Sequence, residues 1–327
     1  MANWPFRHGV HDLGNGLYGY VQPDGTWGWS NAGLVTSRGE TLLVDTLMSI
    51  PLTETMLADF AKIPGGARID KLVNTHANPD HYLGNAAVEG AEIISTRTAL
   101  EEMEGFNPAA LVNLSANWQN MGDAGEFLFE TMGRQFDFSG AENLKLPTTT
   151  FERRLTLMIG DKSVELTDLG PAHTGSDTIA WVPEDRTVFT GDLVFNEGHP
   201  IVWAGPFSNW IAACEYMEAL DPQIVVPGHG PITDVAAIRN LRGYFEHLRK
   251  EARGRFEAGM DWREAGRDIP IQEYAHWTDP ERVVANVYSL YREWDPEMEA
   301  VPPFMLFAEM NHYRKAHDAA QECGHAH

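Results

Sequence analysis

The chain has 327 residues, of which 43% are hydrophobic and 22% charged, so it is long enough to bury a substantial core. Its 47 acidic residues outnumber its 24 basic residues, and the formal net charge of -23 disfavours nucleic acid and anionic membranes as partners. Only Cys214 and Cys323 are present, which excludes a disulfide framework or a cysteine-based zinc site.

The beginning of the chain, MANWPFRHGVHDLG, contains no apolar run of signal-peptide length. No later segment reaches the roughly 18 consecutive apolar residues of a membrane span. We therefore expect a cytoplasmic protein.

The predicted elements begin with short strands separated by glycine turns, over residues 16–22, 26–37 and 40–46. A helix is predicted over 51–63, and a buried strand over 70–76 follows it. This succession of strands and helices is typical of a layered α/β protein.

The same alternation continues on both sides of an irregular segment. Residues 90–103 are predicted as a strand and a helix, whereas residues 104–150 are irregular, helical in places and rich in Phe, Met and Gly. The later elements are strands over 153–170 and 177–195, a helix over 207–220, a strand over 222–230, and helices over 233–259 and 279–294. We expect a domain over 1–240 with an insertion at about 104–150, and a helical C-terminal extension over 241–327 that packs on the same domain.

Polar side chains follow several of the predicted strands, where α/β proteins commonly build their sites. His76, Asp80 and His81 come directly after a strand in NTHANPDHYLGN. His173 in GPAHTGSDT, Asp192 in FTGDLVF and His229 in VVPGHGP occupy similar places, each close to glycine. Neutral imidazole and carboxylate groups are ligands for zinc and similar ions. Four such clusters predict a metal site.

The motifs LLVDT with Asp45, THANPDH, AHTGSDT, TGDLVF and VPGHGP, in this order, resemble the metallo-β-lactamase superfamily over residues 15–235. The resemblance implies an αββα sandwich of two mixed β-sheets flanked by helices, with a metal site at one edge. It also implies two metal positions with the following residues: His76 and His173 in the first, Asp80, His81 and His229 in the second, Asp192 between them, and Asp45 supporting the site from behind the ligands.

Asn78 departs from the family pattern His-x-His-x-Asp-His, because it stands where the second histidine is expected. A carboxamide is a weak ligand for zinc but an acceptable one for harder ions. We expect zinc, as one or two ions, with iron or manganese as alternatives. Asn78 either orients a water or substrate oxygen, or is a substitution without a special role.

The chemistry expected of this site is hydrolysis, because a bound metal makes hydroxide available at neutral pH. The resemblance gives Asp80 the role of accepting a proton or orienting that hydroxide. The substrate is expected to be a small ester, lactone, sulfate or halide. The alternatives are a non-haem iron oxidoreductase, such as a dioxygenase, and a non-catalytic metal-binding protein.

Aromatic residues near the expected site suggest what it binds. Phe106 and Trp118 lie in the insertion, and Trp203 and His199 follow the Asp192 motif. If these side chains line a pocket under a lid, the substrate is apolar or aromatic. Alternatively, the aromatic rings pack the insertion onto the body or form a homodimer contact.

Overall fold

The computed structural model describes residues 4–324. Twelve strands in this part of the chain form two mixed sheets. The first sheet has the strand order β1 (Gly9–Gly14), β2 (Leu17–Val21), β3 (Ala32–Ser37), β4 (Glu40–Val44), β5 (Lys71–Val73), β6 (Glu92–Thr96) and β7 (Thr149–Phe151). The second has the order β12 (Ile224–Val226), β11 (Thr187–Phe189), β10 (Thr178–Val182), β9 (Lys162–Asp168) and β8 (Arg154–Ile159).

The pairing explains why both sheets are mixed. In the first sheet β1 to β4 are antiparallel, and β4 to β7 are parallel because helices connect them. In the second sheet only β11 and β12 are parallel, with α6 between them. The carboxyl ends of β5, β11 and β12 each lead directly into a loop that carries polar residues.

The ten α-helices are α1 (Ile50–Phe60), α2 (Pro79–Tyr82), α3 (Arg97–Glu104), α4 (Ala109–Asn117), α5 (Gly122–Leu128), α6 (Phe207–Ala219), α7 (Val235–Glu257), α8 (Trp262–Asp268), α9 (Arg282–Trp294) and α10 (Pro303–Gly324), within the described residues. None of these helices is long and apolar enough to cross a membrane.

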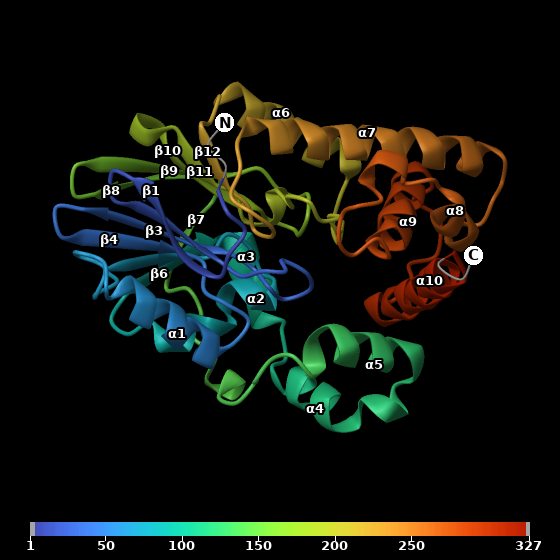
Figure 1. Ribbon diagram of the computed structural model, residues 1–327, viewed down its shortest axis with the longest axis horizontal. Coiled ribbons are helices and arrows are strands. Elements are labelled where there is room, and N and C mark those ends of the chain that lie inside the picture. Colours follow the sequence, from blue (N-terminus) through green and yellow to red (C-terminus); the bar gives the residue numbers. More distant parts are fainter. Residues whose placement is uncertain (1–3, 325–327) are drawn as a thin grey trace.

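Apolar side chains hold the layers together. Between the sheets, residues such as Val35 and Val44 of the first sheet pack against Val182 and Phe189 of the second. The outer face of the first sheet is covered by α1, and that of the second by α6 and α7 (Figure 1). This is the predicted αββα sandwich.

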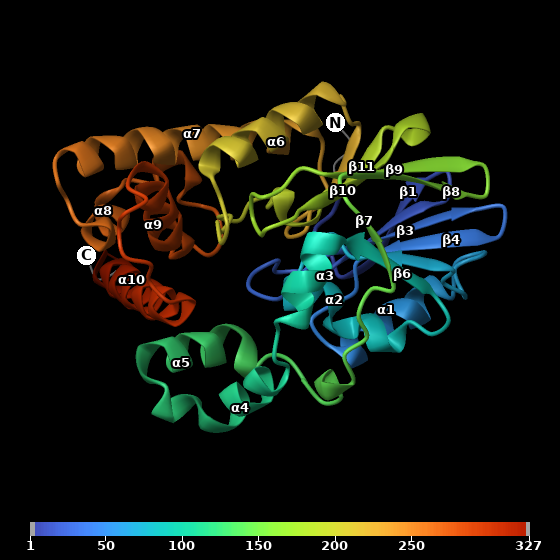
Figure 2. The ribbon, with the colours of Figure 1, turned by 180° about the vertical axis from the view of Figure 1, so that it is seen from behind.

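The insertion and the C-terminal helices project from the same side of the sandwich. Figures 1 and 2 show α4 and α5 apart from the sheets, with α5 beside α10. Lys315 of α10 lies 3.1 Å from Asp123 and 2.7 Å from Glu126 of α5, and the rings of Phe127 and Phe307 are stacked. Two segments far apart in the sequence therefore meet on this side of the molecule.

One predicted strand was too long. The segment 26–37 was expected to be extended throughout, but β3 begins only at Ala32. The backbone turns between Thr26 and Trp29, and the Asn31 amide donates to the carbonyl oxygens of Pro227 and Gly230. Because these bonds replace those of a strand ladder, residues 26–31 form a loop beside the end of β12.

Candidate metal centre

The six predicted ligands come together at one edge of the sandwich and are at least nine-tenths buried. The loop after β5 and helix α2 supply His76, Asp80 and His81. The loops after β9, β11 and β12 supply His173, Asp192 and His229 respectively. Their donor atoms form two groups, in each of which all atoms lie within 4.8 Å of one another: His76, His173 and Asp192, and Asp80, His81 and His229.

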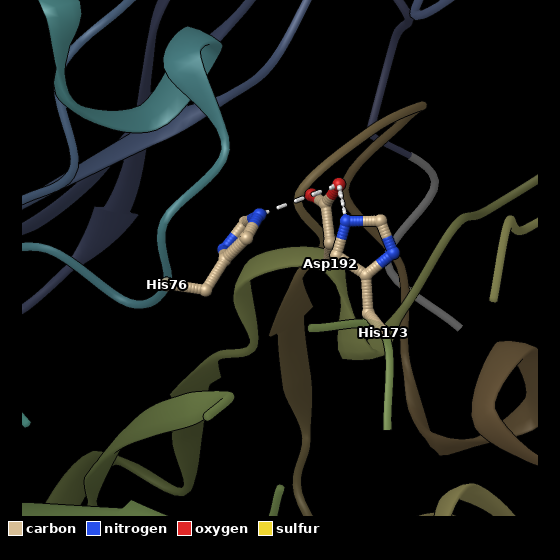
Figure 3. A group of neighbouring side chains, drawn as sticks. All are labelled: His76, His173 and Asp192. Atoms are coloured by element: carbon tan, nitrogen blue, oxygen red, sulfur yellow. Dashed lines mark ion pairs between the residues drawn. The ribbon is translucent and has the colours of Figure 1, made fainter. Parts of the chain in front are cut away.

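Asp192 belongs to the first group and also faces the second. Its Oδ2 is 3.2 Å from Nε2 of His173 and 3.8 Å from Nε2 of His76, as Figure 3 shows for the first group. Its Oδ1 is 3.0 Å from Nε2 of His81, and its Oδ2 is 3.5 Å from Nε2 of His229. One carboxylate thus faces all four imidazoles.

All four imidazoles are held by the nitrogen that points away from the centre. Nδ1 of His173 donates to the carbonyl oxygen of Ile201 at 2.7 Å, and Nδ1 of His229 donates to that of Gly25 at 3.1 Å. Since a carbonyl can only accept, both rings carry their hydrogen on Nδ1 and present Nε2 to the centre. Such fixed tautomers are the usual preparation of a histidine for binding a metal.

Asp45 holds the other two rings. Its Oδ2 accepts from Nδ1 of His81 at 2.9 Å and from the hydroxyl of Thr75 at 2.8 Å. Because that hydroxyl donates to Asp45, its oxygen is left to accept from Nδ1 of His76, 2.9 Å away. Asp45 adopts a left-handed backbone conformation with φ of 64°, a strained geometry that places its carboxylate behind both ligands.

The polar atoms inside the centre fit a metal ion. Among the described residues, Nε2 of His76 is buried without a hydrogen-bond partner, and Nε2 of His81 and Oδ1 of Asp192 lie 3.0 Å apart but without hydrogen-bond geometry. Buried polar atoms are nearly always paired, so these atoms, which belong to two clusters of candidate ligands, fit a bound cation. The imidazole and carboxylate donor set suits zinc and similar ions.

The charges of the centre agree with this arrangement. Burial alone would raise the pKa of Asp80, but His81 and His229 lower it to about 2. Burial would likewise raise the pKa of Asp192, yet the surrounding imidazoles hold it well below its usual value. Burial and the charge of His81 keep the pKa of His76 well below its usual range, so its ring is neutral. The low pKa values of Asp80 and Asp192 mean that both carboxylates are ionised.

Asn78 lies at the first group. Its amide nitrogen is 2.8 Å from Nε2 of His173. Because Nδ1 of His173 donates to Ile201, Nε2 can accept from the amide, through the same lone pair that would bind a metal. Asn78 therefore competes for one ligand of the first group.

The four residues predicted to line a pocket occupy different places. The backbone N–H of Trp203 donates to the carbonyl oxygen of His173, whereas the ring of Phe106 packs edge-on against Tyr82. Trp118 stacks on Phe129 within the insertion. Both ring nitrogens of His199 are bonded to tyrosines, to the hydroxyl of Tyr244 and the carbonyl of Tyr274, within the helical extension.

Several contributors were not predicted from the sequence. Asp177 accepts from the backbone N–H of Ala172 and Thr174 and fixes the loop of His173; burial raises its pKa to about 7. The sequence signal for Asp177 was its place in the AHTGSDT motif, close to the candidate ligand His173. The contributions of Thr75 and of the carbonyls of Gly25 and Ile201 depend on backbone geometry and have no signal in the residue types.

An aromatic cluster lies beside the centre and joins distant segments. Trp27 packs against Phe127 of α5, Trp203 and Phe307 of α10, with ring centroids 5.5–6.5 Å apart. Ile201, whose carbonyl holds His173, belongs to the same apolar cluster. Apolar side chains of the insertion and of the C-terminal helix thus pack in the cluster that contains Ile201.

Comparison with known proteins assigns the chain to a family. The sequence model of the metallo-beta-lactamase superfamily matches residues 25–229. The beta-lactamase-like protein 2 homolog of Caenorhabditis elegans is 26% identical over 106 residues, 32% of this chain and 35% of that protein. The chain thus matches about a third of the length of that curated relative.

Solved structures show the same fold. A metallo-beta-lactamase from Pontibacter korlensis is similar with a TM-score of 0.54 and 18% identity, over 73% of this chain and 99% of that one. The inverting sec-alkylsulfatase Pisa1 from Pseudomonas sp. is similar with a TM-score of 0.64 and 13% identity, over 90% of this chain and 52% of that one. The second likeness extends into the helical extension.

Proposed function

Because this chain belongs to the metallo-β-lactamase superfamily, we propose that it is a metal-dependent hydrolase of small apolar or aromatic molecules. One observation carries the proposal: four imidazoles, each anchored through Nδ1, converge with Nε2 on the carboxylate of Asp192. The bond broken would be that of an ester, a lactone, a sulfate or a halide.

Zinc is the proposed ion, because imidazole nitrogen and carboxylate oxygen are its preferred donors. A zinc ion would lower the pKa of a bound water and polarise the bond under attack. The protein's own residues prepare this chemistry. Asp45 fixes His81 and, through Thr75, His76, so the ligands need little reorganisation before binding.

The second position is expected to fill first. Within residues 4–324, no side-chain amide bonds to the side chain of Asp80, His81 or His229, whereas His173 of the first position accepts from Asn78. Asp80, which is ionised and lies 3.2 Å from His229, can also accept a proton or orient the attacking oxygen. Asn78 is half-buried, and its amide can orient a substrate oxygen at the same edge.

The aromatic cluster supports an apolar or aromatic substrate. Trp27, Trp203 and Phe307 come from three different segments and pack ring against ring in the cluster that contains Ile201. Apolar pockets with a few fixed polar groups are typical of small-molecule sites. Sec-alkyl sulfates belong in the test panel, because the alkylsulfatase shares the fold of 90% of this chain. A homodimer and a cytoplasmic location remain predictions.

The test combines metal analysis with a substrate screen. Purified protein is assayed for zinc, iron and manganese, and then for hydrolysis of aryl esters, lactones, alkyl and aryl sulfates and halogenated aromatics. His229→Ala should lose most bound metal and nearly all activity, since it removes a ligand of the second position. His247→Ala is the matched control, because that ring is bonded to Pro270 on the outside of α7. Iron with oxygen uptake would favour the oxidoreductase instead, and full metal content in His229→Ala would refute the site.

A further inference from the structure

Arg282 is a buried charge in the first turn of α9, with 2% of its surface exposed. Its guanidinium carbon lies 4.2 Å from the ring centroid of Trp27 and 5.2 Å from that of Phe195. Nη1 donates to the carbonyl oxygen of His199 at 2.9 Å, and Nη2 lies 3.0 Å from Oδ2 of Asp279. Burying a charge is costly, so these contacts must hold the guanidinium in one orientation.

Phe195 connects Arg282 to the metal ligands. Its ring stacks on the imidazole of His229, with centroids 5.0 Å apart and planes only 4° from parallel. The same ring meets His173 edge-on at 5.7 Å. One phenyl ring therefore contacts a ligand from each of the two groups, while Arg282 lies near it.

Two residues at the start of α9, Glu281 and Arg282, contact Trp27. Its indole N–H donates to Glu281 at 2.9 Å, and its ring lies near the Arg282 guanidinium. Two residues before Trp27, the carbonyl of Gly25 accepts from Nδ1 of His229. The edge of the His229 ring is thus fixed by the loop of Trp27, and its face is fixed by Phe195; Arg282 contacts both supports.

We propose that Arg282 is a positioning residue of the metal centre, which fixes the orientation of His229 by holding Phe195 and Trp27. The inference rests on the metal site of the proposed function. It makes α9, which lies outside the family match over 25–229, a part of that site. Without the guanidinium, the Phe195 ring and the Trp27 loop would lose a shared partner, and His229 would be less well oriented for metal binding.

The alternative is that Arg282 only stabilises the packing of the helical extension. The two roles differ in one measurement. A packing role lowers the melting temperature but leaves the metal affinity of the folded protein unchanged. A positioning role weakens metal binding at temperatures where the protein is fully folded.

The experiment uses Co²⁺ as the probe, with affinity from chelator competition and ligand geometry from the visible spectrum. Arg282→Met should weaken Co²⁺ binding about 10- to 100-fold and change the spectrum, the range found when supporting residues of metal ligands are removed. Arg282→Lys should also weaken it, because lysine keeps the charge but lacks the planar guanidinium. Arg263→Met is the matched control: its guanidinium also lies 4.2 Å over a ring, that of Trp262 in α8, and pairs with Glu309.

Phe195→Leu provides the second test, because it removes the stacked ring and retains an apolar side chain. If the two residues act together, the double variant Arg282→Met/Phe195→Leu should lose no more Co²⁺ affinity than the single variant that binds Co²⁺ less tightly. Additive losses, or wild-type affinity and spectrum in Arg282→Met, would overturn the inference. Should Arg282→Met fail to fold, Arg282→Lys and Phe195→Leu decide by the same criteria. A wild-type protein without Co²⁺ affinity would refute the metal centre itself, which is a different result.

Discussion

The backbone of Gly228 lies against the carboxylate of Asp192, so closely that a Cβ at this position would collide with Oδ1 of Asp192. The loop after β12 therefore approaches the loop after β11 as only glycine allows. This contact brings His229, the next residue, to the carboxylate that faces all four imidazoles.

Gly228→Ala should disrupt the metal centre. The added methyl group must displace either Asp192 or the backbone of Gly191, so we expect loss of most bound metal and a loss of stability of about 2 kcal/mol or more. Metal analysis and thermal unfolding measure the two effects. Gly254→Ala is the control, because a Cβ there meets no atom of the described residues outside its own helix backbone within 4 Å. Since Gly254 lies in α7, alanine should stabilise that variant by up to about 1 kcal/mol.

Asn78→His should increase occupation of the first metal position. The substitution removes the amide that occupies Nε2 of His173 and adds a third imidazole. We expect metal content to rise from about one to about two equivalents under the same supply. Activity need not rise, because the second ion takes the place of the polar group that Asn78 presents. Asn78→Ala separates the two effects, since it removes the amide without adding a ligand. Two full equivalents in the wild type would contradict the prediction.

The metal-free protein should become less stable as pH rises from 6.5 to about 9. Burial disfavours the charged form of His229, but Asp192 and Asp80 raise its pKa to about 9 from a usual 6.5. A raised histidine pKa contributes stability that is fully present below the unfolded value and is lost as pH rises through the folded value. Melting temperatures of chelator-treated protein measure this effect.

Metal affinity should change in the opposite direction over the same interval, because the ligands must release protons to bind. Titration in buffers of different ionisation enthalpy counts the protons released. Replacement of His247 by Gln should leave both profiles unaltered, since that ring lies outside the centre. Flat profiles for the wild type would count against the charged state of His229.

Changes in the aromatic cluster should affect substrate binding and leave the metal in place. Trp203→Leu is expected to raise the Michaelis constant about 2- to 12-fold, because an aromatic contact contributes about 0.5–1.5 kcal/mol. Trp118→Leu should have a smaller effect, since Trp118 stacks on Phe129 within the insertion, whereas the backbone of Trp203 bonds to that of His173. Equal Michaelis constants across this series, with unchanged metal content, would favour the interpretation that the rings only pack the insertion.

The strand pattern predicted a layered α/β fold, and the resemblance to the superfamily implied the αββα sandwich with the candidate ligands at one edge. The structure brings these six residues together, because each follows a strand whose apolar pattern is clear. His76, for example, comes soon after β5, and His229 soon after β12. The parallel neighbours β4, β5 and β6 explain why strand ends carry the site in the first sheet.

Other features depend on contacts that no local pattern reveals. Arg282 stands at the start of an apolar helix, where an arginine usually faces solvent, and its partners Trp27 and Phe195 come from two other segments. The loop over 26–31 was predicted as a strand because its aromatic residues have high strand propensity, but tertiary bonds to the end of β12 override that propensity.

The meeting of α5 with α10 has a consequence for how this protein could diversify. The ligands come from the strand ends of the sandwich, whereas the rings near them come partly from the insertion and the C-terminal helix. If the proposed substrate binds beside this cluster, mutations in α5 or α10 change its surroundings while the ligand loops keep their sequence. Because α5 and α10 are joined by ion pairs and stacked rings, we expect the two segments to vary together among related chains, while the ligand loops stay the same.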